Sequence, residues 1–353
     1  MSIFSPFQDH LGNVINKHFD KEVVFYTTYG YQRGGEWVVP ARVWVRRRKP
    51  YVFDDVAALW PGGDAPGEDE IKRFGLCSED FVAVSCDEDK VSFQIEGDED
   101  GETYHFGSAT NANGLAKESF VLPAEKAERL VSASGSRWLT LRVKADGKLG
   151  DAEGRGRVVL LEPEGLSVVS DIDDTIRVTE ILAGPKRVAE RTFFMEYAAV
   201  EGMRDRYLKI LDAHPGHANV AFHYVSGGPW PLYRLLHEFL IEDEQFPEGT
   251  FHMKDFDKSL RDPATFRRNL HNYAEGSMNT QEMKVAEISS MMTNLPGRRF
   301  VLFGDSGERD PEAFREVKER FGGRVEKIYI RDVKGEGENS DRLRDMTVIP
   351  AEG

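Results

Sequence analysis

The feature that most constrains this chain is a short apolar run that stops at a cluster of acids. Residues 166–169 read Leu-Ser-Val-Val and lead directly into Ser170-Asp171-Ile172-Asp173-Asp174-Thr175. A strand this apolar is typical of a parallel sheet that is covered on both faces. Acids that follow such a strand reach the crevice outside the carboxyl end of the sheet, where these folds place their ligands. The sequence therefore predicts an α/β domain with an acidic site.

The carboxylates of Asp171 and Asp173 can take different roles in a group-transfer reaction. Asp171 has a reference pKa of about 3.9, so it is ionised without help from a base and can act as a nucleophile. Asp173 is placed to exchange protons with a leaving oxygen. A divalent cation would offset the repulsion between these acids.

Two more apolar runs end in polar groups further along the chain. Residues 299–303 lead into Gly304-Asp305-Ser306-Gly307-Glu308-Arg309-Asp310, and residues 222–225 lead into Ser226-Gly227-Gly228. The two glycines leave backbone N–H groups free to meet an anion. We therefore expect two acidic strand ends and one hydroxyl-bearing strand end at the same edge of the sheet.

A lysine between the second and third of these runs is a candidate phosphate ligand. Lys284 opens the amphipathic stretch 284–292, which returns directly to the strand before Asp305, as an α/β crossover requires. Lys254 and Lys258 lie too early for that connection. We predict that Lys284 faces the site and that Lys254 is a solvated loop lysine.

In these four motifs the chain resembles the haloacid dehalogenase-like phosphatases. More narrowly, SDIDDT, YVSGGPWPLY and FVLFGDSGERDPEAF resemble the Mg-dependent phosphatidate phosphatases typified by the yeast actin-patch-associated enzyme. The resemblance implies that Asp171 forms an aspartyl-phosphate and that Asp173 protonates the departing alcohol and then activates water. It further implies a set of phosphate-binding residues, Thr175, Ser226, Gly227 and Lys284, and a Mg²⁺ site made by Asp171, the Asp173 backbone carbonyl, Asp305 and Asp310.

Simpler interpretations of the same residues exist. An acidic chain yields Asp pairs readily, and residues 171–174 could form a solvated turn or a helix N-cap. Ser226 taken alone is typical of a turn. Asp174 could support the metal site or act only as a cap. The occurrence of all four motifs in order at strand ends favours the catalytic interpretation.

The first half of the chain has the two-residue periodicity of strands. Apolar side chains alternate with polar ones at 91–95 and 139–143, and about seven short strands are expected, as in an immunoglobulin-like sandwich. The predicted architecture is this all-β domain followed by an α/β, Rossmann-like domain of the haloacid dehalogenase type. The predicted boundaries are an amphipathic segment at 1–21, the sandwich at 22–163, the phosphatase domain at 166–333 with a small cap at about 177–219, and an acidic flexible tail at 334–353.

Composition limits the possible partners and compartments. The 353 residues carry a net charge of −15, which disfavours binding to nucleic acid through phosphate contacts. Two cysteines, Cys77 and Cys86, form no disulfide framework, as expected of a cytoplasmic protein. No targeting segment is recognisable, and no apolar run approaches the ~20 residues of a membrane-spanning helix.

The first 50 residues are the candidate for peripheral membrane contact. They hold 8 Lys/Arg against 4 Asp/Glu, including the basic run at 46–49 and an amphipathic apolar stripe from Phe4 to Phe19. Such a surface could meet anionic lipid headgroups. Docking of the stripe on the first domain, and a solvated strand end for the basic run, are the alternatives.

Three classes of function are compatible with the sequence. The first is a Mg²⁺-dependent phosphatase that converts phosphatidate into diacylglycerol and phosphate at a membrane surface. The second is the same chemistry on a soluble phosphate ester or phosphoprotein. The third is a noncatalytic membrane or cytoskeletal adaptor, which the intact acidic and basic motifs disfavour.

Overall fold

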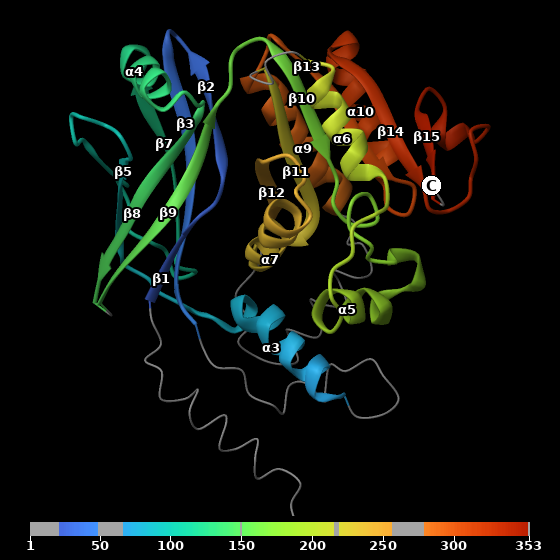
Figure 1. Cartoon of the computed structure of the whole chain (residues 1–353), viewed down its shortest axis with the longest axis horizontal. Coiled ribbons are helices and arrows are strands. Elements are labelled where there is room, and N and C mark those ends of the chain that lie inside the picture. Colours follow the sequence, from blue (N-terminus) through green and yellow to red (C-terminus); the bar gives the residue numbers. More distant parts are fainter. Residues whose placement is uncertain (1–20, 49–65, 149, 215–218, 256–278, 352–353) are drawn as a thin grey trace, which may run out of the picture.

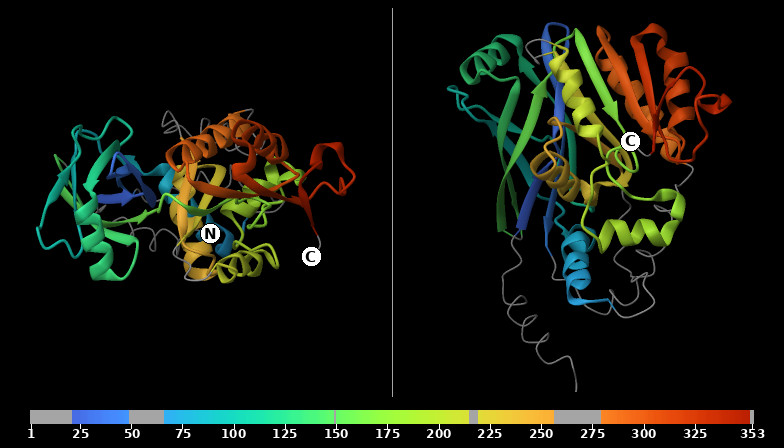
Figure 2. Two further views of the ribbon diagram at one scale, coloured as in Figure 1. Left: turned by 90° about the horizontal axis from the view of Figure 1, so that it is seen from above. Right: turned by 45° about the vertical axis from the view of Figure 1, so that its right-hand side comes forward.

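The computed structural model describes residues 21–48, 66–148, 150–214, 219–255 and 279–351. These residues form two sheets that stand side by side, the first built from the N-terminal half and the second from the C-terminal half (Figures 1 and 2). The predicted amphipathic segment lies outside the described residues except for Lys21. Within the described residues, no helix is both long and apolar enough to cross a membrane.

The C-terminal sheet has six strands, and every neighbouring pair is parallel. In chain order its strands are arranged 3-2-1-4-5-6, so the order reverses on either side of the first strand. Doubly wound sheets bind ligands at this reversal point. The strands across the sheet are β12 (Gly249–Lys254), β11 (Val220–Pro229), β10 (Gly165–Ser170), β13 (Arg298–Asp305), β14 (Val325–Asp332) and β15 (Thr347–Pro350).

Helices cover both faces of this sheet, which explains why β10 is apolar along its length. Val168 packs in the same apolar cluster as Tyr207 of α6 (Met203–Asp212). Its neighbour Val169 points to the opposite face, where it packs with Ile288. The helices on that face are α9 (Asn279–Asn294) and α10 (Asp310–Phe321).

The N-terminal sheet has nine strands and folds back on itself around one apolar core. Phe25 of the first strand and Phe93 of the fifth lie near opposite ends of the strand order, yet their ring centroids are 6.3 Å apart. Gly156 permits this closure, because a Cβ there would lie 2.5 Å from the Phe25 ring. The strands are β1 (Lys21–Phe25), β2 (Thr28–Arg33), β3 (Glu36–Arg47), β4 (Val84–Ser85), β5 (Lys90–Ile95), β6 (Thr103–His105), β7 (Leu115–Pro123), β8 (Trp138–Gly147) and β9 (Gly150–Leu160). The immunoglobulin-like designation stays a prediction.

Two helices interrupt the half that was expected to be mostly strands. Helix α3 (Glu68–Val82) buries Phe74 and Cys77, and α4 (Ala124–Ser134) buries Ala127 and Leu130. Each buried pair is spaced three residues apart, so each helix presents one apolar stripe. The stripes are too short to stand out from the surrounding strand pattern.

The insert predicted as a cap contains three helical elements. They are η1 (Ile181–Ala183), α5 (Pro185–Phe193) and α6, which covers one face of the sheet. Phe194, just after α5, stacks on Phe74 of α3 with centroids 4.8 Å apart. The aromatic side chains at the end of α5 are therefore buried packing, and the role of the insert as a cap stays a prediction.

The predicted flexible tail is ordered in the part that the structure describes. Residues 347–350 form β15, which pairs in parallel with β14 and completes the sheet. Arg342 anchors the preceding turn by binding Glu312 at 2.7 Å and Glu336 at 2.6 Å. The acidic composition that indicated disorder instead supplies partners for this arginine.

The basic run at the end of β3, for which lipid contact and a solvated strand end were the two interpretations, includes a buried arginine. Arg46 is buried, and it pairs with Asp80 of α3 and with Glu22 of β1. Arg48 pairs with Glu22 at 2.9 Å, and Lys49 lies outside the described residues. Because a buried guanidinium needs charged partners, Arg46 joins elements of the protein, and both Arg46 and Arg48 are already paired with protein carboxylates.

Arg298 joins three strands at the end of the C-terminal sheet opposite the acids, and this role can be tested by substitution. Its buried guanidinium donates to the backbone carbonyls of Glu162, Glu164, Leu166 and Asn219 at 2.5–3.1 Å and so joins β10, β11 and β13. Arg298→Met would remove these charged hydrogen bonds from the backbone carbonyls, so we expect a loss of about 3–5 kcal/mol of unfolding free energy. Urea denaturation measures it.

The neighbouring arginine is a matched control. The Arg299 side chain is 62% exposed and pairs with Glu326 on the surface. Arg299→Met should cost less than about 1 kcal/mol. Similar losses in the two variants would show that Arg298 does not join the strands as described.

Candidate functional site

The acidic groups meet where the strand order reverses. Strand β10 lies between β11 and β13, with Ser170 opposite Tyr224 on one side and Phe303 on the other. Asp171 follows β10 directly, and its backbone N–H donates to the Phe303 carbonyl at 2.9 Å. The polar ends of β11 and β13 therefore flank Asp171.

Four carboxylates gather here around one ammonium group. Oxygens of Asp171, Asp305 and Asp310 all lie within 4.8 Å of one another, and the three residues are buried. Lys284 Nζ lies 2.7 Å from Asp171 Oδ1, 2.5 Å from Asp310 Oδ1 and 3.0 Å from Glu308 Oε2. The structure thus brings the predicted Lys284 to the predicted nucleophile and adds Glu308, to which the sequence assigned no role.

Burial and the surrounding charges shift the pKa values of these groups. Burial, together with Asp310, Glu308 and Asp305, raises the pKa of Asp171 well above its usual value, although Lys284 opposes the shift. The pKa of Asp305 is raised in the same way. Burial acts to lower the pKa of Lys284, but the surrounding carboxylates outweigh burial and raise it. Lys284 is therefore charged, and the cluster still lacks cationic charge.

A divalent cation fits this donor set. Asp305 Oδ1 accepts from the backbone N–H groups of Gly307 at 2.6 Å and Glu308 at 3.1 Å. Among the described residues, its buried Oδ2 has no hydrogen-bond partner. A buried carboxylate oxygen without a partner is costly, and hard divalent cations favour clustered carboxylate oxygens. Asp171, Asp305 and Asp310 are thus suitable metal ligands.

The Asp173 carboxylate lies outside this cluster and has partners of its own. Its Oδ1 accepts from Arg177 Nη2 at 2.5 Å and from Thr179 Oγ1 at 2.7 Å, while Ser226 Oγ donates to Oδ2 at 3.2 Å. Burial acts to raise the pKa of Asp173, but Arg177 and Thr179 outweigh burial and lower it. The group is therefore ionised, and the carboxylate is not among the clustered metal-ligand oxygens.

Arg177 is the main site residue that sequence reasoning missed. It is buried, and its guanidinium carbon lies 4.6 Å from the centroid of the Tyr197 ring. A buried carboxylate requires a nearby charge or several hydrogen bonds. The requirement that something must neutralise Asp173 could therefore have directed attention to the first arginine after the motif.

Asp174 acts as a cap for the turn that follows the motif. Its carboxylate accepts from the backbone N–H groups of Thr179 at 2.8 Å, Glu180 at 2.7 Å and Ile181 at 2.6 Å. Because Thr179 in turn binds Asp173, this cap fixes one of the groups that orient the second carboxylate. Of the two roles considered for Asp174, the structure supports the cap.

The remaining predicted residues lie beside the two acids. Thr175 Oγ1 donates to Asp171 Oδ2 at 3.1 Å. Ser226 Oγ accepts from the Gly228 N–H at 2.9 Å, at a point where the pairing of β11 with β12 shifts register. A Cβ on Gly227 would lie 2.7 Å from Thr280, so only glycine fits there without displacement. We call residues 226–228 the bulge segment.

Of the other two candidate lysines, Lys254 alone lies within the described residues. Lys254 ends β12 opposite Pro229 and is partly buried, so its prediction as a solvated loop lysine is wrong. Burial lowers its pKa, and the charge of Glu308 opposes the shift. Lys258 lies outside the described residues.

Comparison with known proteins identifies the C-terminal half. Residues 166–332 match the family described as phosphatidate phosphatase APP1, catalytic domain. A Schizosaccharomyces pombe protein described as uncharacterized is 28% identical over 181 residues, which are 50% of this chain and 26% of that protein. Phosphatidate phosphatase APP1 of Saccharomyces cerevisiae is 26% identical over 173 residues, 48% of this chain and 26% of the yeast protein. The chain thus spans about a quarter of the length of each of these relatives.

Solved structures are less informative. A sialyltransferase from Photobacterium damsela aligns with a TM-score of 0.22 and 9% identity over 69% of this chain and 37% of that one. A β-D-glucuronidase from Dictyoglomus thermophilum aligns with a TM-score of 0.22 and 10% identity over 89% and 43%. Neither likeness carries an argument. The sequence comparisons show that residues 166–332 of this chain match the phosphatidate phosphatase APP1 catalytic-domain family.

Proposed function

We propose that the protein is a Mg²⁺-dependent phosphomonoesterase that works through an aspartyl-phosphate at Asp171. The observation that carries this proposal is the position of Asp171, which is buried beside Lys284 within an acidic cluster that suits a divalent cation. The family membership of residues 166–332 supports phosphate-ester hydrolysis. We further propose that this domain is of the haloacid dehalogenase type, with residues 177–219 as its cap.

The first step transfers the phosphoryl group to the protein. An Asp171 carboxylate oxygen attacks phosphorus, the bond from phosphorus to the ester oxygen breaks, and the alcohol leaves with a proton. Thr175 holds Asp171 Oδ2, which leaves Oδ1 beside Lys284. Mg²⁺, held by the oxygens of Asp171, Asp305 and Asp310 with the Asp173 carbonyl, would supply the positive charge that lets an anionic phosphate approach these acids.

Asp173 transfers a proton in both steps of the proposed reaction. Arg177 favours its ionised form, which suits the second step, where the carboxylate takes a proton from the water that releases phosphate. In the first step it must carry a proton to the leaving oxygen. An arriving phosphate dianion raises the pKa of a neighbouring carboxyl and competes for Ser226, and both effects favour protonation of Asp173.

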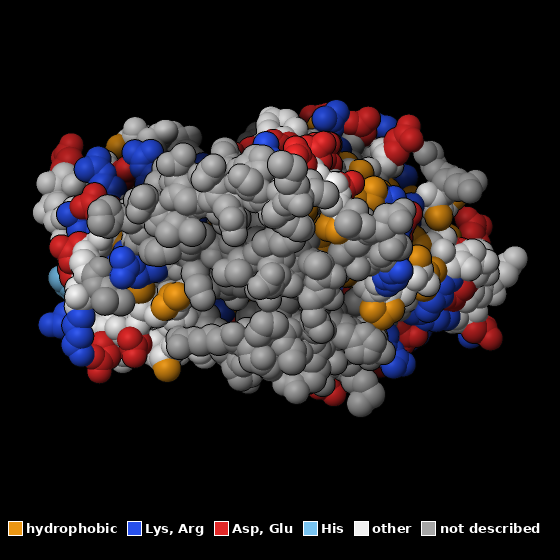
Figure 3. All heavy atoms as spheres, turned by 90° about the horizontal axis from the view of Figure 1, so that it is seen from below, with side chains coloured by type: hydrophobic (Ala, Val, Ile, Leu, Met, Phe, Trp, Pro, Cys, Tyr) orange, Lys and Arg blue, Asp and Glu red, His pale blue; other side chains and the backbone are white. Residues whose placement is uncertain are grey.

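Phosphatidate is the substrate that we propose, with a cytoplasmic protein acting at a membrane surface. The basis is the name of the family and of the budding-yeast relative. Charges of both signs are mixed on the described part of the face seen in Figure 3, and Arg46 and Arg48 have protein partners. The remaining candidate for membrane contact in the first 50 residues is therefore the segment 1–20, which lies outside the described residues.

Metal binding should be visible as thermal stabilisation. Because Mg²⁺ would relieve repulsion among buried acids, saturating Mg²⁺ should stabilise the native protein by about 2–3 kcal/mol at a hundredfold excess over Kd. Asp305→Asn should lose this stabilisation and the hydrolytic activity together. Differential scanning calorimetry with and without Mg²⁺ checks the first effect independently of activity.

Two results would contradict the proposed metal site. An undiminished Mg²⁺ shift in the Asp305→Asn variant would remove Asp305 from the metal site. Full activity of the native protein in excess chelator would contradict metal dependence.

Lys284 should be the lysine whose loss damages turnover. Lys284→Ala removes a buried ammonium from the side of Asp171, and a loss on the order of 10² or more in kcat is expected for a contact that strengthens in the transition state. The assay is release of phosphate from an aryl phosphate ester. Lys254→Ala is the comparison, and a larger loss in that variant would assign the phosphate contact to Lys254.

The lipid substrate can be tested separately from the chemistry. Deletion of residues 1–20 should reduce hydrolysis of phosphatidate in anionic vesicles at least several-fold and leave hydrolysis of a soluble aryl phosphate unchanged, because only the vesicle assay requires docking. Phosphate release is measured on both substrates. Equal effects on the two would exclude docking by this segment. A native protein that cleaves the soluble ester but no phosphatidate in mixed micelles would favour a soluble substrate.

A further inference from the structure

Arg42 of the N-terminal sheet contacts two segments that lead away from the site. Its guanidinium lies 4.6 Å from the centroid of the Trp230 ring and 5.5 Å from that of Tyr26. The Tyr26 and Trp230 rings are themselves 4.3 Å apart. Arg42 Nη2 lies 2.6 Å from Asp255 Oδ1. One side chain of β3 thus contacts both Trp230 and Asp255, which directly follow two neighbouring strands of the other sheet, β11 and β12.

Trp230 and Asp255 lie at the end of the bulge in β11, one on each of the two paired strands. The register of β11 against β12 shifts between Ser226 and Pro229, where Pro229 lies opposite Lys254. Trp230 directly follows Pro229, and Asp255 directly follows Lys254. Arg42 therefore holds the two strands together at the point where regular pairing resumes after the bulge segment.

The bulge segment needs such support because of its composition. Gly227 and Gly228 have no side chains to pack, and glycine loses more conformational freedom on ordering than other residues. On one side Gly227 lies against Thr280, and Ser226 is bound to Asp173. On the other side, the contacts of Trp230 and Asp255 with Arg42 come from the N-terminal sheet. Bulges beside active sites commonly aim particular groups at a ligand.

We propose that Arg42 is a positioning residue for phosphate binding: it fixes the bulge segment, and with it Ser226, through Trp230 and Asp255. This inference rests on the proposed phosphatase function of the site. It makes the N-terminal sheet part of the machinery that holds the substrate phosphate. Pre-ordered N–H and hydroxyl groups bind an anion more tightly because less entropy is lost on binding.

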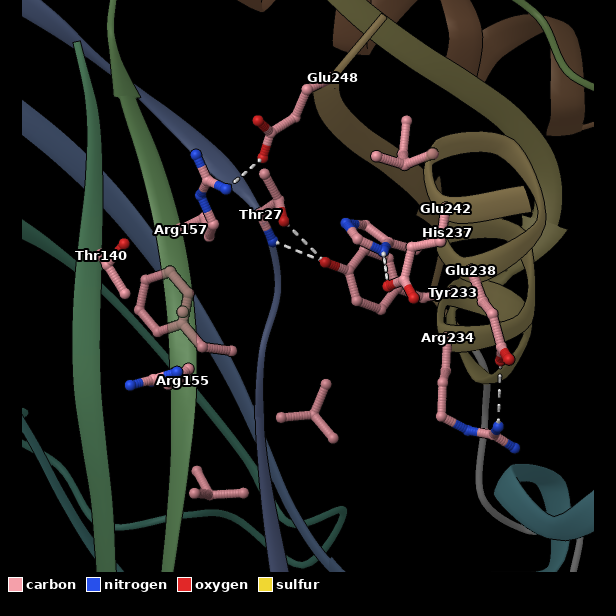
Figure 4. A pocket seen from close by; sticks show the side chains of 15 residues that line it. Thr27, Thr140, Arg155, Arg157, Tyr233, Arg234, His237, Glu238, Glu242 and Glu248 are labelled. Carbon is pink, nitrogen blue, oxygen red and sulfur yellow. Dashed lines mark hydrogen bonds and ion pairs between the residues drawn. The ribbon is translucent and has the colours of Figure 1, made fainter. Parts of the chain in front are cut away.

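A second arginine provides a control of the same chemistry. Arg157 of β9 lies 5.0 Å from the centroid of the Trp138 ring. It also lies 3.1 Å from Glu248 (Figure 4), so it too combines a ring contact with an ion pair to the C-terminal half. It borders a cleft of about 680 Å³ between β1 and α7 (Tyr233–His237). Glu248 directly precedes β12, at the end of that strand opposite the site.

The experiment compares Arg42→Gln and Arg157→Gln in the full chain. With Mg²⁺ and an aryl phosphate, Arg42→Gln should raise KM and the inhibition constant of inorganic phosphate about tenfold, whereas Arg157→Gln should leave both unchanged. Hydrogen exchange of the amides at 226–230 should become faster only in the Arg42 variant. Melting temperatures, measured in parallel, should fall by similar amounts in both variants.

Asp255→Asn covers the case in which Arg42→Gln does not fold. It removes the ion pairs that Asp255 makes with Arg42 at 2.6 Å and with Lys117 at 2.9 Å, and it leaves the contacts of Arg42 with the aromatic rings. It should change KM and amide exchange in the same direction by a smaller amount. Equal effects of the Arg42 and Arg157 variants, or unchanged KM and exchange in both the Arg42 and Asp255 variants, would overturn the proposal. A native protein that releases no phosphate from any ester would instead contradict the proposed function, and amide exchange would still decide the role of Arg42.

Discussion

The structure depends on the burial of four carboxylates around the ammonium group of Lys284. Such a cluster is stable only where the backbone holds it in place and a cation can neutralise it. The cluster lies where the strand order reverses at β10. There Asp171 is positioned between the ends of β11 and β13. Arg177 and Asp174 then separate the second carboxylate from the first by giving Asp173 partners of its own. Two acids two residues apart thus have different partners and oppositely shifted pKa values.

The N-terminal sheet contributes to the same arrangement from outside. Tyr29 of β2 packs edge-on against His223 of β11 at 5.6 Å, and Tyr233 donates or accepts a hydrogen bond with Thr27 at 2.8 Å (Figure 4). Burial lowers the pKa of His223 well below its usual value, so its ring is neutral and packs as part of the core. The contacts of Arg42 continue this interface to the edge of the site.

Much of the site was predictable, because apolar runs that end in acids identify the carboxyl ends of buried strands. The crossover argument also selected Lys284, which lies 2.7 Å from Asp171. Arg177 could not be found this way, since a single buried arginine leaves no periodic signal. The run at 46–49 shows the converse: its composition resembles a surface patch, yet Arg46 is buried because Asp80 and Glu22 neutralise it. The ion pairs of Arg46 and the pairing of β15 with β14 both join segments that are distant in the sequence. A local sequence pattern does not predict such contacts.

The most direct test of the account is whether phosphate becomes attached to Asp171. The Asp173→Asn variant, incubated with Mg²⁺ and a labelled aryl phosphate, should form the intermediate and hydrolyse it slowly, because activation of water is impaired. After rapid acid quench and proteolysis, mass spectrometry should find the label on the peptide that contains Asp171. Turnover without phosphate on that peptide, in a variant shown to hydrolyse the ester, would contradict nucleophilic catalysis by Asp171.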